Sequence, residues 1–261
     1  MPMGKNKNLH VGIGIDLNHI AVVEIIQNKN RITLQQTWHK KFSSAVFNYA
    51  DLKSHFQNIA QCFSTHSKIL NISISHKLWN VQTFELNQTL SKAETQKYLK
   101  QQVDLKNIYY IYHFINLNDH VVHLILVSIT REILDPLLHL LITVNLRPRK
   151  IEPDVFSLAR IIPTPNDWNL IIDTRHEQFI LVLTQQHQLF SLKHISQDYT
   201  QLSSQVLLYK NQVKSLSRVF FYPQNNVDSR FEIETGMKAE ILTHHQIEAE
   251  FLTAYCAALE G

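Results

Sequence analysis

Two short polar segments of the sequence, each beside an apolar stretch, could carry phosphate chemistry. Asp16 and Asn18 lie between two apolar stretches, and Asp173 and Arg175 follow a third. A hairpin that grips phosphates needs glycine at its tip, where the backbone approaches the ligand closely, and a carboxylate that organises Mg²⁺ through water. These segments are therefore the candidate tips of a nucleotide site.

Other catalytic and metal-binding motifs are missing from the sequence. It contains no Gly-x-Ser-x-Gly elbow, no His-Glu-x-x-His and no Gly-x-x-x-x-Gly-Lys loop. The 15 histidines are scattered, and none has the spacing of a zinc site. His244 and His245 are neighbours whose side chains point in different directions from either a helix or a strand. We expect no metal site.

Composition favours a folded protein in a reducing compartment. Of the 261 residues, 44% are hydrophobic and 18% are charged, which excludes a disordered chain. A formal net charge of +3 is too weakly basic to predict a nucleic-acid partner. Cys62 and Cys256 lie in apolar helical patterns and are expected to be buried thiols. With no apolar run of spanning length and no secretory signal, we expect a cytoplasmic protein.

The predicted elements repeat along the chain. Residues 10–75 read as three meandering strands, a helix and a fourth strand, and residues 167–223 read in the same order. Residues 230–234 and 238–242 are predicted strands, and 246–260 is predicted as a helix with one buried apolar stripe. Repetition of this unit is the signature of an actin-like α/β fold, in which two RNase H-like halves face each other across a nucleotide cleft.

A segment with a different order of elements lies between the repeats. Residues from about 76 to 145 read as a strand, a helix, a two-stranded hairpin and a second helix, a βαββα module. Ser91 with Glu94 is a capping-box pattern that gives the first helix a defined start. The second helix tolerates Pro136 because it lies in the first turns.

The chain has four stretches, residues 11–25, 144–162, 169–195 and 251–261, that occur in a familiar order. They resemble the PilM family of type IV pilus assembly proteins. In the most specific, an apolar helix ends before Leu-x-Pro, and Ile-Glu and a second apolar helix ending in Arg follow. Its residues are Leu146, Pro148, Ile151, Glu152, Phe156, Leu158 and Arg160. The short length and eroded motifs are most similar to the gammaproteobacterial HofM variants and to ComA-type competence proteins.

The resemblance implies a domain organisation. Residues 1–152 form the first actin-like half and carry the inserted module, and the C-terminal helix, 246–261, packs back on this half. Residues 153–245 form a reduced second half. It lacks the subdomain that caps the adenine, because no room is left for it between Ile195 and Asp198.

The resemblance also implies an eroded nucleotide site. In the family, the first tip has the motif Asp-x-Gly, followed a few residues later by Lys. Alignment from Glu24 puts Gly14 at the Asp position, Asp16 at the Gly position and Ala21 at the Lys position. In the alternative alignment, Asp16 occupies the Asp position of the motif and Asn18 occupies the Gly position. The Asn18 side chain would then fill space that a phosphate needs.

The second tip departs from the family pattern in the same way. Asp173 is retained, but Arg175 stands where the glycine belongs. Arginine can pair with phosphate, yet on a hairpin tip we expect it to be solvated. Pro223 and Asn225 replace a Gly-Gly turn, and the whole chain has only 5 glycines. We therefore expect no catalysis, no bound nucleotide and no cofactor.

Family members capture the N-terminal cytoplasmic tail of PilN, a bitopic inner-membrane protein, and through it join PilO and the pilus machinery. The tail is short, apolar and basic at one end, so its groove needs an apolar floor. The candidates for that floor are the module's aromatic residues, Trp79, Phe84, Tyr109, Tyr110 and Tyr112, of which Tyr112 is the strongest. Alternatively, alternate members of this set fill the module's own core.

The sequence thus favours a non-catalytic, actin-like scaffold of type IV pilus biogenesis that serves DNA uptake. It would reach the inner membrane only through its PilN-like partner. An ATP-binding, PilM-like ATPase is one alternative. A type II secretion scaffold similar to the cytoplasmic domain of GspL is another.

Overall fold

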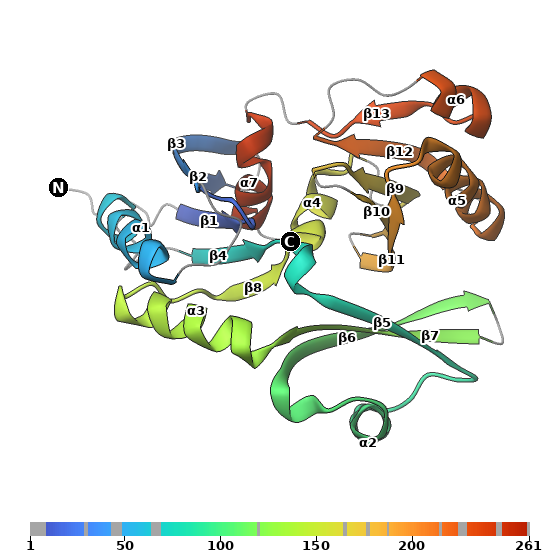
Figure 1. Cartoon of the computed structure of the whole chain (residues 1–261), viewed down its shortest axis with the longest axis horizontal. Coiled ribbons are helices and arrows are strands. Elements are labelled where there is room, and N and C mark those ends of the chain that lie inside the picture. The colour runs from blue at the N-terminus through green and yellow to red at the C-terminus, as the bar shows by residue number, and fades with distance from the viewer. Residues whose placement is uncertain are drawn as a thin grey trace.

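The structure is a computed structural model. It describes residues 9–28, 31–42, 49–63, 69–118, 121–163, 166–175, 178–186, 188–213, 216–223, 229–243 and 247–259. The described strands form two five-stranded sheets and one three-stranded sheet (Figure 1). Their orders are β3-β2-β1-β4-β8, β11-β10-β9-β12-β13 and β5-β7-β6.

The first five-stranded sheet combines a meander with two parallel strands. Its strands are β1 (Leu9–Ile15), β2 (His19–Asn28), β3 (Arg31–Lys41), β4 (Ile69–Ile74) and β8 (Lys150–Pro153). β1, β2 and β3 are antiparallel, whereas β4 and β8 run parallel to β1. Helices α1 (Tyr49–Cys62) and α3 (Arg131–Thr143) pack their apolar faces on one side of it.

The second five-stranded sheet repeats this arrangement. Its strands are β9 (Trp168–Asp173), β10 (Gln178–Gln185), β11 (Gln188–Ser196), β12 (Leu216–Tyr222) and β13 (Ala239–Ile241). β9 to β11 are antiparallel, and β12 and β13 run parallel to β9. Helices α5 (Tyr199–Gln212) and α6 (Ser229–Thr235) cover one face. Both sheets contain the three meandering strands and the later strand that the repeated sequence pattern predicts, whereas β8 was not predicted.

Helices α4 (Asp154–Leu158) and α7 (Leu252–Ala258) lie between the two five-stranded sheets (Figure 1). All residues of α7 are buried. The prediction of a longer helix with a single buried stripe is wrong, because α7 begins only at Leu252, after the 3₁₀ turn Ala249–Phe251. A helix with a sheet on each side must be apolar all round.

Glycines of β1 allow α7 to approach closely. A Cβ atom on Gly12 would lie 1.9 Å from the carbonyl oxygen of Ala254, and one on Gly14 would lie 2.6 Å from Thr253 Oγ1. Gly14 is therefore inside β1 and faces the helix, not at the hairpin tip. The Asn71 amide donates to the carbonyl of Ala257 at 3.0 Å and fixes α7 from β4.

The most specific sequence motif, at residues 146–160, makes hydrogen bonds and ion pairs in the region around α7. Arg160, in the 3₁₀ turn Ala159–Ile161, donates to Glu152 through Nη2 at 2.6 Å and lies 2.5 Å from it through Nη1. Its Nη1 also donates to the carbonyl of Cys256 at 3.0 Å. Ser157 and Lys150 complete the contacts of the buried Glu152 carboxylate. The motif thus joins β8 and α4 to α7.

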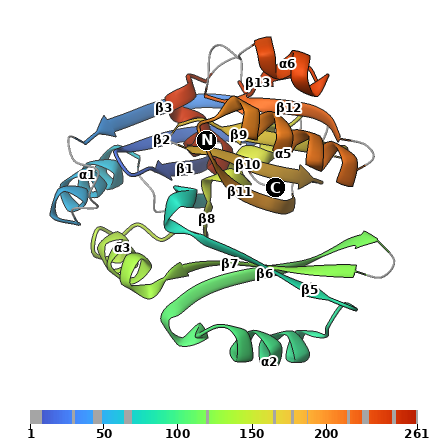
Figure 2. The same ribbon diagram turned by 45° about the vertical axis from the view of Figure 1, so that its right-hand side comes forward.

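The inserted module is a separate layer below both five-stranded sheets (Figure 2). It consists of β5 (Asn80–Leu86), β6 (Ile108–Asn118), β7 (Val121–Thr130), α2 (Lys92–Gln102) and the 3₁₀ turn Leu105–Asn107, and the 3₁₀ turn His76–Leu78 precedes it. The predicted capping box is present, with Ser91 accepting from the Glu94 backbone and Glu94 accepting in return. One face of its sheet packs on α2, and the other packs on the rest of the protein.

Two local expectations are wrong. Residues 230–234 are helical rather than extended, because Phe231 packs on Phe221 with ring centroids 5.2 Å apart and Thr235 Oγ1 donates to the Phe231 carbonyl. Cys62 is exposed, and only Cys256 is buried. No helix within the described ranges has the length and apolar character needed to cross a membrane.

Candidate functional site

Polar side chains gather where the parallel strands of both sheets end. Asp16 follows β1, His76 closely follows β4, and Asp154 follows β8 directly. From the second sheet, Asp173 is the last residue of β9 and Tyr222 is the last residue of β12. The carboxyl ends of parallel strands are where α/β sheets place their binding sites. Here the two sheets bring these edges together.

Arg175 joins this cluster. Its Nη2 donates to Asp173 and to Asp154, each at 2.5 Å, and its Nε donates to both oxygens of Asp173 at 3.0 and 3.1 Å. Its Nη1 donates to Asp16 Oδ2 at 3.4 Å. The guanidinium carbon lies 5.0 Å from the centre of the Tyr222 ring. The expectation that Arg175 is solvated is wrong: its side chain is only 9% exposed.

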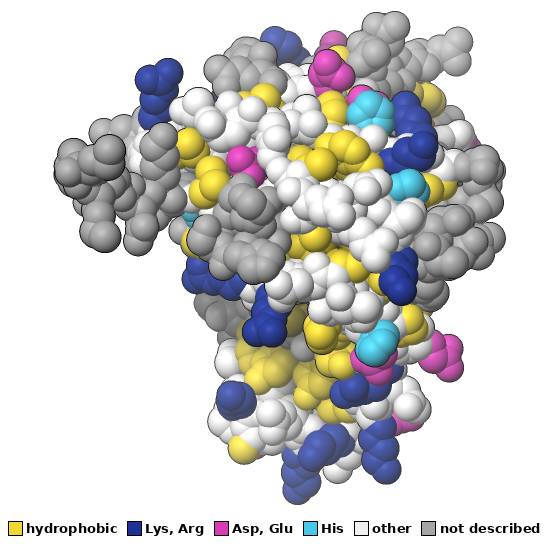
Figure 3. Space-filling view, turned by 90° about the vertical axis from the view of Figure 1, so that its left-hand side faces the viewer, with side chains coloured by type: hydrophobic (Ala, Val, Ile, Leu, Met, Phe, Trp, Pro, Cys, Tyr) yellow, Lys and Arg dark blue, Asp and Glu magenta, His cyan; other side chains and the backbone are white. Residues whose placement is uncertain are grey.

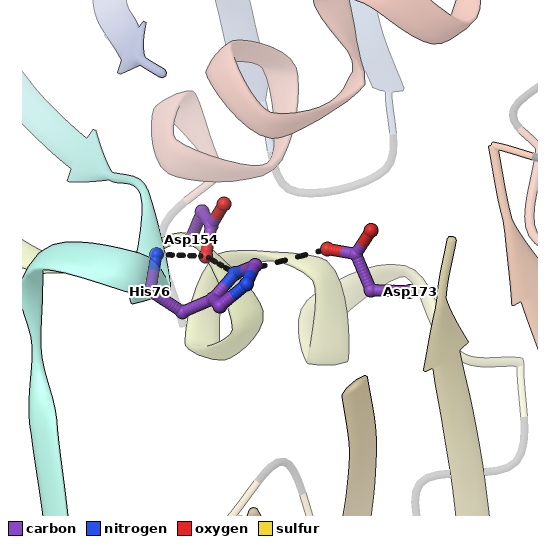
Figure 4. Close-up of side chains that lie close together, drawn as sticks. All are labelled: His76, Asp154 and Asp173. Carbon is purple, nitrogen blue, oxygen red and sulfur yellow. Dashed lines mark hydrogen bonds and ion pairs between the residues drawn. The ribbon is translucent and has the colours of Figure 1, made fainter. Parts of the chain in front are cut away.

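The His76 ring lies between Asp154 and Asp173 (Figure 4). Its backbone N–H donates to Asp154 Oδ1 at 2.9 Å, and its ring Nδ1 lies 2.9 Å from the same oxygen. Nδ1 is also 3.7 Å from Asp173 Oδ2. The ring centroid of His194, on β11, is 6.1 Å from that of His76.

Burial and charge act in opposite directions on the pKa values of the cluster. Burial disfavours the charged form of His76, but Asp154 and Asp173 outweigh it and raise its pKa. Burial likewise opposes ionisation of Asp154, yet Arg175 and His76 hold its pKa well below the usual range. The pKa of Tyr222 is raised, first of all by burial. The cluster therefore favours an ionised Asp154 and the charged form of His76.

The cluster also contains a possible set of metal ligands. Ligand atoms of His76, Asp154 and Asp173 all lie within 4.8 Å of one another, and carboxylates with an imidazole suit a divalent cation. The Arg175 guanidinium, however, is 2.5 Å from both carboxylates, so the positive charge is supplied by the chain itself. The ligand atoms are therefore already paired with the Arg175 guanidinium. The expectation that the protein has no metal site stays a prediction.

A cleft of about 560 Å³ opens beside the cluster. It is lined by the first tip, by Arg175 and Tyr222, and by the segment Glu248–Glu250. Lys41 is paired with Glu250 at 3.4 Å on its rim. None of the described glycines lines it, so it offers no bare backbone for close phosphate contact. A neighbouring cavity of about 440 Å³ shares Pro223 with it.

The predicted partner-binding residues are divided between the two faces of the module's sheet. Phe84, Tyr110 and Tyr112 pack around Leu99 of α2 and help to form the module's core. Figure 3 shows apolar side chains gathered over this lower part of the molecule, with Lys and Arg below them. The structure thus brings three of the five candidates together.

The other two candidates lie on the opposite face. Tyr109 donates its hydroxyl proton to Asp135 at 2.7 Å, and the guanidinium of Arg131 lies 4.3 Å from its ring centre. Trp79 packs against the cores on both sides of the first sheet. No described residue accepts a hydrogen bond from its buried Nε1.

Ile111 is an exposed residue that the sequence reasoning missed. It is 48% exposed and lies on the edge strand β6, on the same face as Tyr109 and His113. Nε2 of His113 donates to the carbonyl of Leu189 in β11, and its ring contacts Phe156. Ile111 therefore sits between a residue tied to α3 and a residue tied to the second sheet.

His76 and Asp154 were also missed, although a signal for them exists. Each is a polar residue next to the end of an apolar strand, as Asp16 and Asp173 are. Two sheets with the same topology must bring such residues to corresponding edges. A search for polar residues at the end of each parallel strand in both repeats would have identified His76 and Asp154.

No family model matches the chain, and no curated protein matches it by sequence. Solved structures do. The PilM-PilN type IV pilus biogenesis complex matches at TM-score 0.74 and 12% identity, over 95% of this chain and 97% of that chain. The cytoplasmic domain of EpsL, an inner-membrane component of the type II secretion system of Vibrio cholerae, matches at 0.58 and 10%, over 95% and 94%.

A Bacteroides thetaiotaomicron protein of unknown function with an actin-like ATPase fold matches at TM-score 0.55 and 13% identity, over 92% of this chain and 93% of that chain. These matches span nearly the whole of both chains in each pair. The predicted fold class is confirmed: this chain has the actin-like fold.

Proposed function

We propose that this protein is a non-catalytic, cytoplasmic scaffold of type IV pilus biogenesis that serves DNA uptake. It binds the N-terminal cytoplasmic tail of a PilN-like inner-membrane protein. Support comes from the higher TM-score to the PilM-PilN complex, 0.74, than to the EpsL domain, 0.58. A type II secretion scaffold is accordingly the weaker candidate.

The observation that carries the non-catalytic assignment is the position of Arg175. Its guanidinium lies among Asp16, Asp154 and Asp173, at the meeting point of the two tips. Carboxylates that are already paired and buried are poor ligands for a hydrated Mg²⁺. A Mg²⁺ ion would have to displace this arginine from the carboxylates.

The surface around Ile111 supports a docking role for the module. β6 is an edge strand of the three-stranded sheet, so its outer backbone groups can pair with an extended peptide. Ile111 supplies an exposed apolar side chain on that strand, and Tyr109 and Trp79 lie on the same side of the sheet. An apolar tail that adds to β6 would bury Ile111.

The test is titration of the purified chain with a fluorescent peptide that reproduces the tail of the PilN-like protein encoded beside it. Ile111→Asp should weaken binding at least about tenfold, because it removes apolar contact and buries a charge. Ile233→Asp, at an 81% exposed position on α6, is the matched control and should bind as the wild type does. The proposal is contradicted if the peptide does not bind the wild type, or if it binds Ile111→Asp and Ile233→Asp equally well.

An ATP-binding protein is the rival from the enzyme class. The cleft of about 560 Å³ beside both tips is the observation in its favour. Nucleotide binding would raise the melting temperature in the presence of Mg²⁺. That measurement separates the two candidates.

A further inference from the structure

The two sheets share an apolar core within the part of the chain that the structure describes. α4 and α7 lie between them, and side chains of both sheets pack on these helices. Apolar burial is not directional, so it holds the halves together without fixing the angle between them. A contact that fixes the angle must have defined geometry.

The Arg175 cluster has that geometry. The guanidinium contacts carboxylates from three segments: Asp16 at the first tip, Asp154 at the start of α4, and Asp173 at the second tip. Its planar fork sets the direction of each contact, and ion pairs of this kind are about twice as strong as neutral hydrogen bonds. His76 holds Asp154 from the side of the first sheet.

We propose that Arg175 is a built-in clamp, an internal cation that holds the two halves of the actin-like fold at one fixed angle without a bound ligand. Asp16 and Asp154, which follow strands of the first sheet, anchor it there, and Asp173 and Tyr222 anchor it to the second. The clamp depends on the charge and the fork of one side chain. It concerns the two halves alone and does not rest on the identity of any partner.

The experiment measures the distance between spin labels in the full-length chain. Cys62 on α1 is exposed and provides one label, whereas Cys256 is buried and does not react. Asn211→Cys, at an exposed position near the end of α5, provides the second. The unaltered clamp should give one narrow distance distribution.

Arg175→Gln should shift the main peak or add a second peak. Arg218→Gln is the matched control, since Arg218 lies in the same half and its pair with Glu240 is partly exposed and distant from the cluster. It should leave the distribution unchanged. If Arg175→Gln fails to fold, Arg175→Lys carries the same test, because lysine keeps the positive charge but lacks the planar fork. A folded variant, judged by circular dichroism, that keeps the wild-type distribution overturns the proposal.

Discussion

The Cβ atom of an alanine at position 12 would lie 1.9 Å from the carbonyl oxygen of Ala254. The obstacle is helix backbone, which cannot rotate away as a side chain can. Gly12→Ala should therefore destabilise the protein by about 3 kcal/mol or more, at the upper end of overpacking costs. Gly14→Ala should cost less, because its main obstacle is the rotatable hydroxyl of Thr253. Urea unfolding measures both, and equal losses would refute this account.

Removal of the Arg160 side chain should leave the buried Glu152 carboxylate without its main partner. Arg160→Met should cost about 3–5 kcal/mol, as is usual when one member of a buried ion pair is lost. Arg218→Met, which breaks the partly exposed pair with Glu240, should cost only about 0–1 kcal/mol. Chemical denaturation of the two variants is the measurement. Similar losses would show that the Glu152–Arg160 pair contributes no more than a surface pair.

His76 should make stability depend on pH. Its folded-state pKa is raised above the usual 6.5, so its contribution is complete below pH 6.5 and is lost as the pH rises through the folded-state value. The groups that face it are Asp154 and Asp173, which favour its charge, and Arg175 and His194, which oppose it. The His76→Gln variant should not lose this part of its stability as the pH rises.

The measurement is the urea midpoint of wild type and His76→Gln across a pH series. The difference between the two profiles isolates His76 from other histidines, such as His113, whose pKa burial lowers. Parallel profiles would rule out a raised pKa at this position.

MgATP should not stabilise the protein. At about 1 mM nucleotide, a site of micromolar affinity would add about 4 kcal/mol of stability, which a thermal scan detects easily. With Arg175 paired to both aspartates, we expect no change in Tm. A magnesium-dependent rise would favour the ATP-binding alternative.

The two thiols should differ sharply in reactivity. Cys62 is exposed, whereas Cys256 is buried in α7 and its pKa is raised, first of all by burial. Thiolate is the reactive form, so a chromogenic disulfide should label one thiol in the native protein and the second only on unfolding. Rapid labelling of both under native conditions would contradict the burial of α7.

The sequence predicted the repeated strands because their alternation and length depend on local pattern. It failed at residues 230–234, where Phe231 and Ile233 suggest one strand face, yet Phe231 is buried and Ile233 is 81% exposed on a helix. Contact with β12 decided that segment, and no local pattern records it. The predicted nucleotide and partner sites stay predictions.

The candidate site was harder to predict for a topological reason. His76 and Asp154 are 78 positions apart and meet only because β4 and β8 are neighbours in one sheet. Arg175 was assigned to solvent because it stands on a hairpin tip. That assignment considered only the second half of the fold, whereas residues of the first half cover the tip that carries Arg175.

The position of α7 constrains how the chain folds during synthesis. The helix that covers β1 and β2 comes after all the strands in the order of elements, so it is made long after them. Apolar residues of β2 such as Val23 and Ile25 therefore leave the ribosome long before that cover is made. The nascent chain would need protection by chaperones over this interval, and a ribosome that stalls before residue 252 would leave a sticky, incomplete product.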